Sequence, residues 1–316
     1  AFNSRGEAIA LLKSFEEDFQ TVDVDGNETP KKIPEQNKTY NVYRAIKLGL
    51  GDFFVKNGFK TACLGLSGGI DSAVVLSMAA ETLGPENIRV LLMPSQFSSD
   101  HSVEDARELA ENLGVEYQIV PINETFAALT ATLGPVFGEL PFNVAEENMQ
   151  ARIRGMMMMA ISNKFGNVLL ATSNKSEIAV GYGTLYGDTV GALSIIGDLY
   201  KSEVYDLARY INRQREIIPL NTIMKAPSAE LRLEQKDSDS LPPYDVLDAI
   251  LYRMIEEGQS REEIINAGFD EDEVYIVYNL VVKSEFKRYQ SCPTLRLSTR
   301  PMRTGRTMPL TNKYGC

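Results

Sequence analysis

The stretch that decides the fold runs from Thr61 to Leu83 and reads TACLGLSGGIDSAVVLSMAAETL. Residues 61–66 form a short apolar run that stops at two glycines, and this pattern favours a buried parallel strand over a helix. After Asp71, apolar residues recur at helical spacing as far as Leu83. The stretch therefore predicts a strand, a tight turn and a helix.

The turn between the strand and the helix consists of Ser67, Gly68, Gly69, Ile70, Asp71 and Ser72. Paired glycines let the backbone approach a ligand closely, and the free N–H groups at the start of the helix attract phosphate. No Gly-Lys-Ser/Thr closes the turn, so it is not a Walker A loop, and the Asp71 carboxylate would repel phosphate unless a cation lay between them. The turn thus predicts phosphate together with Mg²⁺. The alternative is that Ser67 and Asp71 only cap the helix.

Apolar runs and helical patterns alternate through the middle of the chain. Such alternation predicts a doubly wound parallel α/β sheet, whose ligands bind at the carboxyl ends of the strands. The expected strands are 61–66, 88–93, 115–120 and one that begins at Val168. The expected helices are 40–58, 71–83, 103–113, 122–133, 143–163 and one that starts at Lys201, followed by a helical C-terminal part at 244–257, 261–267 and 271–289.

A second cluster of polar residues follows the apolar run that begins at Val168. It contains Glu177, Asp188 and Lys201 within a glycine-rich loop and the start of the next helix. If this run joins the sheet, its carboxyl end faces the turn that carries Asp71. Asp71, Glu177 and Asp188 would then supply oxygen ligands for one or two Mg²⁺ ions, and Lys201 would offer a positive charge to phosphate.

Two arginines, Arg152 and Arg154, border a helix that contains four consecutive methionines. Arginines beside so apolar a segment should have anionic partners. The sequence leaves two partners open for each arginine, a phosphate or carboxylate of a ligand and an acidic side chain of the chain itself.

Composition narrows the class of protein. The 316 residues are 44% hydrophobic, enough for a large core, and they include one histidine, His101, and three cysteines without metal-ligand spacing. We expect no disulfide scaffold and a reducing, cytoplasmic compartment. No apolar stretch is long enough to span a bilayer, and no signal peptide is visible, so we expect no membrane association.

The net charge of −11 is unevenly distributed. From Lys283 onward eight basic residues face one acidic residue, so this part carries +7 and the rest −18. An acidic body argues against a general nucleic-acid surface. The basic tail by itself fits either an RNA contact or a solvated arm.

Several motifs carry a resemblance to known families. SGGIDS at 67–72 resembles the pyrophosphate-binding loop of the ATP pyrophosphatase superfamily. TSNKSEIAVGYGTLYGD at 172–188, DLYK at 198–201, PSAELR at 227–232 and DSDSLPPYD at 237–245 resemble the synthetase domain of bacterial glutamine-dependent NAD synthetases. The resemblance implies an adenine nucleotide alpha hydrolase-like fold and ATP-dependent amidation of nicotinic acid adenine dinucleotide to NAD⁺, through an adenylylated intermediate with release of pyrophosphate and AMP.

The resemblance also implies roles for individual residues. Asp71 and Lys201 would be catalytic, and Asp71, Glu177 and Asp188 would bind metal. ATP would contact Ser67, Gly68, Gly69, Asp71, Ser72, Thr172, Lys201 and Ser228, while the dinucleotide would contact Asn148, Arg152 and Asp188. Leu185 departs from the pattern, because relatives that use free ammonia often place a lysine there.

The expected organisation has three parts: residues 1–38, 39–290 and 291–316. The first contains two short predicted strands, 8–12 and 19–24, and a polar linker, and it resembles the end of a glutaminase domain that is otherwise missing from the chain. The alternative is a natural start with its methionine removed. The second is the ATP pyrophosphatase domain, and the third is the basic tail. The family suggests a homodimer.

Residues 214–240 are hydrophilic and lack periodicity, which is typical of a mobile loop that closes over a site or of a plain surface excursion.

Adenylylation followed by attack of ammonia needs no nucleophilic side chain, in agreement with the scarcity of histidine and cysteine. Three rival functions stay open. They are a GMP synthetase, a tRNA thiolase, and a module that binds ATP or AMP without turnover.

Overall fold

In this computed structural model, which describes residues 1–23, 29–232, 235 and 237–311, a parallel sheet forms the centre. Within those residues its strand order is β3-β2-β1-β4-β5. The strands are β1 (Ala62–Gly65), β2 (Ile88–Leu92), β3 (Glu116–Ile119), β4 (Val168–Ala171) and β5 (Leu193–Ser194). The predicted doubly wound parallel sheet is confirmed.

Helices cover both faces of the sheet, because side chains along a strand point alternately to one face and the other. Leu64 and Val90 belong to the larger core, and Cys63 and Leu91 pack on the opposite face with Met158. The larger core is built with α1 (Lys38–Asn57), α2 (Ile70–Leu83), α3 (Asp100–Leu113) and α7 (Lys201–Ile211), and the opposite face is covered by α5 (Val144–Phe165).

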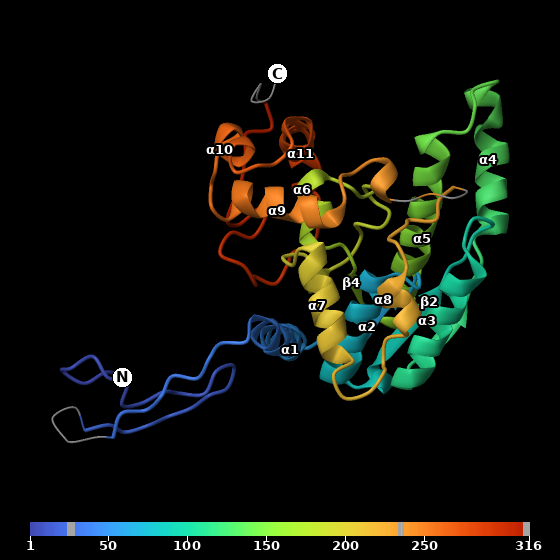
Figure 1. Cartoon of the computed structure of the whole chain (residues 1–316). Helices are drawn as coiled ribbons and strands as arrows, with labels where there is room; N and C mark the ends of the chain where they lie inside the picture. The colour runs from blue at the N-terminus through green and yellow to red at the C-terminus, as the bar shows by residue number, and fades with distance from the viewer. Residues whose placement is uncertain (24–28, 233–234, 236, 312–316) are drawn as a thin grey trace.

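The C-terminal helices lie together in Figure 1. A second hydrophobic core joins them to the middle of the chain. It contains buried side chains from α6 (Lys175–Val180), α9 (Tyr244–Ile255), α10 (Arg261–Asn266) and α11 (Glu271–Lys283). Because α6 follows β4, this helical part is attached directly at the carboxyl edge of the sheet. No helix among the described residues has the length and apolar character needed to cross a membrane.

Helix α4 (Asn123–Phe137) extends beyond residue 133, where the predicted helix ended, and contains Pro135. A proline removes one helical N–H donor, and near a helix end this loss affects only the last turn. The N–H of Gly138 still donates to the carbonyl of Gly134 at 2.9 Å, so the helix closes normally beyond the proline.

The single helix predicted at 271–289 is divided into α11 and α12 (Glu285–Arg288). The interruption is at Ser284, whose hydroxyl donates to the carbonyl of Val180 at 2.8 Å. This buried contact fixes the break against the end of α6. The periodicity of the sequence did not reveal it, because it depends on a residue about a hundred positions away.

The strands predicted at 8–12 and 19–24 are wrong for the residues that the structure describes. Residues 8–12 contain only an isolated bridge between Phe2 and Ala8, and residues 19–23 form no strand. Extended segments become strands only when another strand pairs with them, and the N-terminal segment runs as an arm away from the sheet (Figure 1). Val24 and residues 25–28 of the predicted linker lie outside the described residues.

Residues 214–240 are more ordered than the sequence predicted. They contain α8 (Leu220–Met224) and a 3₁₀ helix (Asp237–Asp239), and Thr222, Ile223 and Asp237 are buried. A plain surface excursion is therefore excluded for these parts. Residues 233, 234 and 236 lie outside the described residues, and closure of this segment stays a prediction.

The basic tail begins as a packed segment and not as a solvated arm. Ser194 of β5 forms a parallel bridge with Thr294, and the backbone N–H groups of Leu297 and Ser298 donate to Asp198 at 2.8 and 2.7 Å. Residues 293–298 of the tail therefore pack at the edge of the sheet, and Met302 further along is buried in the second hydrophobic core. Residues 312–316, which include one basic residue, lie outside them.

Candidate active site

A cavity of about 320 Å³ opens at the carboxyl edge of the sheet. Its wall includes the ends of three adjacent strands, which continue into Ser67 after β1, Met93 after β2 and Thr172 after β4. From β1 the chain passes to β2 on one side, and β4 lies on the other side. This is a topological switch point, where open α/β sheets bind ligands.

The glycine turn forms the floor of the cavity, and α2 leaves it with free N–H groups. The N-cap residue of α2 is Gly69, and no side chain accepts a capping hydrogen bond there. Ser67 and Ser72 instead bond to the turn itself: the hydroxyl of Ser72 donates to the carbonyl of Gly69 at 3.0 Å, and the N–H of Gly69 donates to the Ser67 hydroxyl at 3.2 Å. The interpretation of Ser67 and Asp71 as mere helix caps is therefore wrong.

Gly68 cannot be replaced without strain. Its φ is +79°, and a Cβ atom there would lie 2.1 Å from the carbonyl oxygen of Ser102 in α3. Both the backbone conformation and the packing of α3 over the turn require glycine.

We expect Gly68→Ala to lower the free energy of unfolding by about 3 kcal/mol or more, because a positive φ and a backbone clash act together. Gly58→Ala is the matched control, since Gly58 has φ +74° and no neighbouring atom within 4 Å of the built Cβ. The control should lose about 1 to 2 kcal/mol from strain alone. Denaturant titration measures both, and equal losses would contradict the packing argument.

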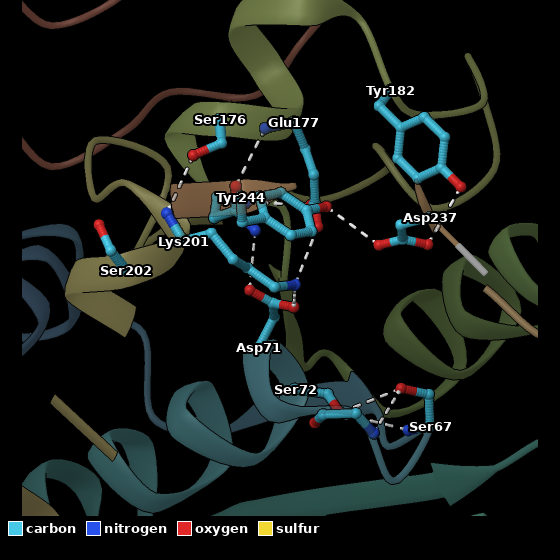
Figure 2. A network of polar contacts seen from close by, with 12 residues as sticks. Ser67, Asp71, Ser72, Ser176, Glu177, Tyr182, Lys201, Ser202, Asp237 and Tyr244 are labelled. Atoms are coloured by element: carbon cyan, nitrogen blue, oxygen red, sulfur yellow. Dashed lines mark hydrogen bonds and ion pairs between the residues drawn. The ribbon is translucent and has the colours of Figure 1, made fainter. Parts of the chain in front are cut away.

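Lys201 joins the two carboxylates that the sequence placed at separate strand ends (Figure 2). Its Nζ donates to Asp71 Oδ2 at 2.5 Å and to Glu177 Oε1 at 3.4 Å. The three side chains come from the starts of α7, α2 and α6, so three helix N-termini converge at this point. Burial alone would lower the pKa of Lys201, but Asp71 and Glu177 raise it above its ordinary value, and the amine is charged.

The pKa of Glu177 is raised to about 8, first by burial and then by the charge of Asp71, with Asp237 adding to the effect. Lys201 acts in the opposite direction but offsets only part of it. Lys201 is paired with two of these carboxylates, Asp71 and Glu177, and Asp237 adds negative charge beside Glu177. This surplus of negative charge favours a bound cation.

Asp237 is a site residue to which the sequence alone assigned no role, although it begins the motif DSDSLPPYD. It lines the cavity, and its two oxygens accept hydrogen bonds from the hydroxyls of Tyr182 at 3.1 Å and Tyr244 at 3.0 Å (Figure 2). The available signal was an aspartate ahead of a helix in a motif shared with a family. Its proximity to Glu177 depends on the fold.

A second layer of hydrogen bonds holds the helices that carry the site. The backbone N–H of Lys201 donates to the hydroxyl of Ser176 at 2.9 Å, and that hydroxyl donates to Asp248 at 2.5 Å. Asp248 also accepts from the backbone N–H of Ser202 at 2.8 Å. One buried carboxylate on α9 therefore fixes the starts of both α6 and α7.

Two other residues predicted to bind substrate, Asp188 and Asn148, are connected through Thr184. Asp188 lines the cavity and accepts from the N–H of Thr184 at 2.7 Å, and the hydroxyl of Thr184 donates to Asn148 at 2.6 Å. Burial raises the pKa of Asp188 above its ordinary value. Asn148 is therefore linked to the cavity through Thr184.

The two arginines differ in position. Arg154 lines the cavity, and its Nε donates to the carbonyl of Met93 at 3.0 Å. Burial lowers its pKa to about 10. Arg152 is exposed and donates to the carbonyl of Leu185 at 3.2 Å, so the structure brings Arg154 and not Arg152 to the cavity wall.

Thr172 and Ser228 both line the cavity. Ser228 belongs to a segment that crosses to α3, where the carboxylate of Glu230 accepts from the hydroxyls of Ser99 at 2.9 Å and Ser102 at 2.7 Å. This contact places residues 226–231 as a wall over the glycine turn.

Asp71, Glu177 and Asp188, which the sequence predicted as ligands for one or two Mg²⁺ ions, do not form a single cluster. Among the described residues, no three acidic, histidine or cysteine side chains lie close enough together to hold a metal ion. Asp71 and Glu177 share Lys201, whereas Asp188 is bound to the loop at Thr184.

A glycine-rich turn and an uncapped helix N-terminus at the switch point of a parallel sheet are the arrangement that nucleotide-binding α/β proteins use. Comparison with known sequences is more specific. The sequence model of the NAD synthase family matches residues 42–291, and the chain belongs to this family.

Two similar proteins are both named glutamine-dependent NAD⁺ synthetase. The protein of Synechocystis sp. is 49% identical over 99% of this chain, and that of Thermotoga maritima is 42% identical over 99%. The chain spans only 57% and 61% of their respective lengths. Enzymes of this name are ligases that form C–N bonds.

Solved structures agree. A glutamine-dependent NAD⁺ synthetase from Acinetobacter baumannii in complex with ADP is 40% identical, with a TM-score of 0.61 over 89% of this chain and 51% of that one. An NH₃-dependent NAD synthetase from Campylobacter jejuni is 30% identical, and an NMN synthetase from Francisella tularensis is 27% identical, with TM-scores of 0.63 and 0.68. Both comparisons cover 79% of this chain and 95% of the other.

Proposed function

We propose that the chain catalyses the ATP-dependent amidation of nicotinic acid adenine dinucleotide to NAD⁺, with release of pyrophosphate and AMP. The observation that carries the proposal is the contact of Lys201 with Asp71 and Glu177 beside an uncapped, glycine-rich helix N-terminus. Family membership supports the same activity.

The residues fit the first chemical step, in which the substrate carboxylate attacks the α-phosphorus of ATP and pyrophosphate leaves. A carboxylate reacts poorly with ammonia, and the mixed anhydride formed with AMP reacts well. The chain contributes alignment and charge stabilisation. In our proposal the N–H groups of residues 70–72 and the amine of Lys201 bind the leaving pyrophosphate, and Thr172 and Ser228 contact ATP.

Mg²⁺ is the metal that suits this arrangement. Magnesium is usually bound by one or two carboxylates together with substrate phosphates and water. Asp71 and Glu177 supply two carboxylates. Burial, and after it the charge of Asp71, raises the pKa of Glu177, and a cation beside this carboxylate would act against both effects. When bound, Mg²⁺ neutralises phosphate charge. We propose Asp71 and Glu177 as its ligands.

The dinucleotide would lie along the part of the cavity that Asp188 and Arg154 line. We propose that Asp188 and Asn148 contact it, as the resemblance implied, and that Arg154 is the arginine that faces it inside the cavity. Arg152 would reach only a part of the ligand that extends out of the cavity.

The nitrogen source in this proposal is ammonia, derived from glutamine in the longer relatives. We propose that residues 39–290 form the synthetase domain and 1–38 the end of a glutaminase domain with its linker. The 316 residues tested alone should then form NAD⁺ when ammonium salts supply the nitrogen and not when glutamine does. Glutamine-driven turnover would show this division of labour to be wrong.

Pyrophosphate release from ATP and Mg²⁺ tests the function. We expect release that depends on nicotinic acid adenine dinucleotide and ammonium. Release with xanthosine monophosphate or tRNA instead would favour a GMP synthetase or a thiolase. Nicotinic acid mononucleotide belongs in the same screen because of the NMN synthetase neighbour, and binding of ATP without any release would leave a nucleotide-binding module.

The proposal includes a homodimer in the cytoplasm. Apolar side chains at the outer end of α4 and α5 support the dimer, since Val136, Leu140 and Val144 are 78%, 71% and 63% exposed. Sedimentation velocity distinguishes a dimer from a monomer.

Two cysteines, Cys63 and Cys292, are free thiols, which fits a reducing compartment.

A further inference from the structure

Asn174 does not line the cavity but bonds to two acidic residues of the site, Asp71 and Glu177. It is fully buried at the N-cap of α6, where its Oδ1 accepts from the N–H of Glu177 at 3.0 Å. Its own N–H donates to Glu177 Oε2 at 3.3 Å, and its Nδ2 donates to Asp71 Oδ1 at 2.8 Å. One side chain thus bonds to α6 and to α2 together.

A role as a helix cap does not explain why residue 174 carries a side-chain amide. Asparagine, aspartate, serine and threonine all cap helices, because a cap needs only an acceptor. The contact with Asp71 needs a donor in addition, and among these residues the amide is the one that presents a separate acceptor and donor. An aspartate at 174 would set a second carboxylate against Asp71, and a serine would lack the nitrogen.

Both oxygens of Asp71 are consequently held by fixed donors. Lys201 Nζ donates to Oδ2 at 2.5 Å and Asn174 Nδ2 donates to Oδ1. Asn174 itself does not line the cavity. We infer that Asn174 is a positioning residue, which holds Asp71 and Glu177 at the spacing in which both face Mg²⁺ and the phosphates of ATP. This inference rests on the proposed function.

The chain offers a matched control in Asn143, the N-cap of α5. It has the same reciprocal capping box: its side chain accepts from the N–H of Ala145 at 2.8 Å, and its N–H donates to Glu146 at 2.8 Å. It does not line the cavity. Because Asn143 is exposed and Asn174 is buried, this control measures the loss of a cap alone, without the loss of a buried hydrogen bond.

The test measures the affinity for α,β-methylene ATP by calorimetry, with and without Mg²⁺, for the unaltered chain, Asn174→Ser and Asn143→Ser. We expect Mg²⁺ to tighten binding in the unaltered chain and in Asn143→Ser. In Asn174→Ser this gain should fall by roughly 10- to 100-fold, the effect of one hydrogen bond to a charged group, with metal-free binding unchanged. Pyrophosphate release should fall in parallel.

A full Mg²⁺-dependent gain in folded Asn174→Ser would overturn the inference. Asn174→Gly is the second variant, since glycine replaces a cap at little cost. If both unfold while Asn143→Ser stays folded, Asn174 is structural and the inference fails. If the unaltered chain shows no Mg²⁺-dependent binding, the proposed function fails, and this inference with it.

Discussion

Asp71→Asn is expected to lower the rate of pyrophosphate release by about a thousandfold or more, because one change removes both a charge partner of Lys201 and a proposed metal ligand. An asparagine keeps the shape of the side chain and still accepts from Asn174, as Asp71 Oδ1 does at 2.8 Å. The fold should therefore be retained. Glu177→Gln should have the same kind of effect, since Glu177 also contacts Lys201.

Initial rates at saturating ATP and a Mg²⁺ series measure this loss. Asp206→Asn is the control, because Asp206 lies on α7 with its side chain 60% exposed, in an ion pair with Arg209. It should keep the full rate. Near-normal turnover in Asp71→Asn or Glu177→Gln would refute the assignment of these carboxylates to the metal and the phosphates.

Lys201→Met should have the second large effect, on activity and on stability together. Loss of the amine removes the proposed pyrophosphate contact and should lower the rate by about 10²- to 10³-fold. It also leaves Asp71 and Glu177 close together and without their shared cation. Removing one partner of a buried ion pair costs about 3 to 5 kcal/mol.

Lys175→Met separates the two effects. Lys175 is fully buried and pairs with Asp198 at 3.0 Å and Glu256 at 2.5 Å, yet it does not line the cavity. Both variants should unfold at lower temperature. Mg²⁺ should restore stability only in Lys201→Met, where the unpaired carboxylates face the cavity. Equal responses to Mg²⁺ in thermal unfolding would contradict the placement of the site.

The sheet could be predicted because its signals are local. The apolar run before Ser67 and the helical spacing after Asp71 are properties of adjacent residues, and the structure has β1 and α2 at those places. The errors occurred where a distant contact decided the outcome. Ser284 breaks a helix through its bond to Val180, and the described residues of the N-terminal segment form only an isolated bridge between Phe2 and Ala8.

The sequence predicted the chemistry of the site but not all of the residues that form it. Glycines, a helix N-terminus and an aspartate indicate phosphate and cation chemistry wherever they occur together. Which arginine faces the cavity depends on the rotation of α5, and this rotation selects Arg154 over Arg152. The place of Asp237 beside Glu177 depends on how the 3₁₀ helix before α9 docks.

By itself, the sequence determined a parallel α/β sheet with a phosphate-binding turn after its first strand, since strand, turn and helix are encoded by neighbouring residues. Only the tertiary structure decided that Asp71, Glu177 and Lys201 meet, with Asn174 behind them. These residues belong to three helices, and the energies that bring them together come from the packing of those helices on the sheet. Spacing along the chain contains no record of that packing.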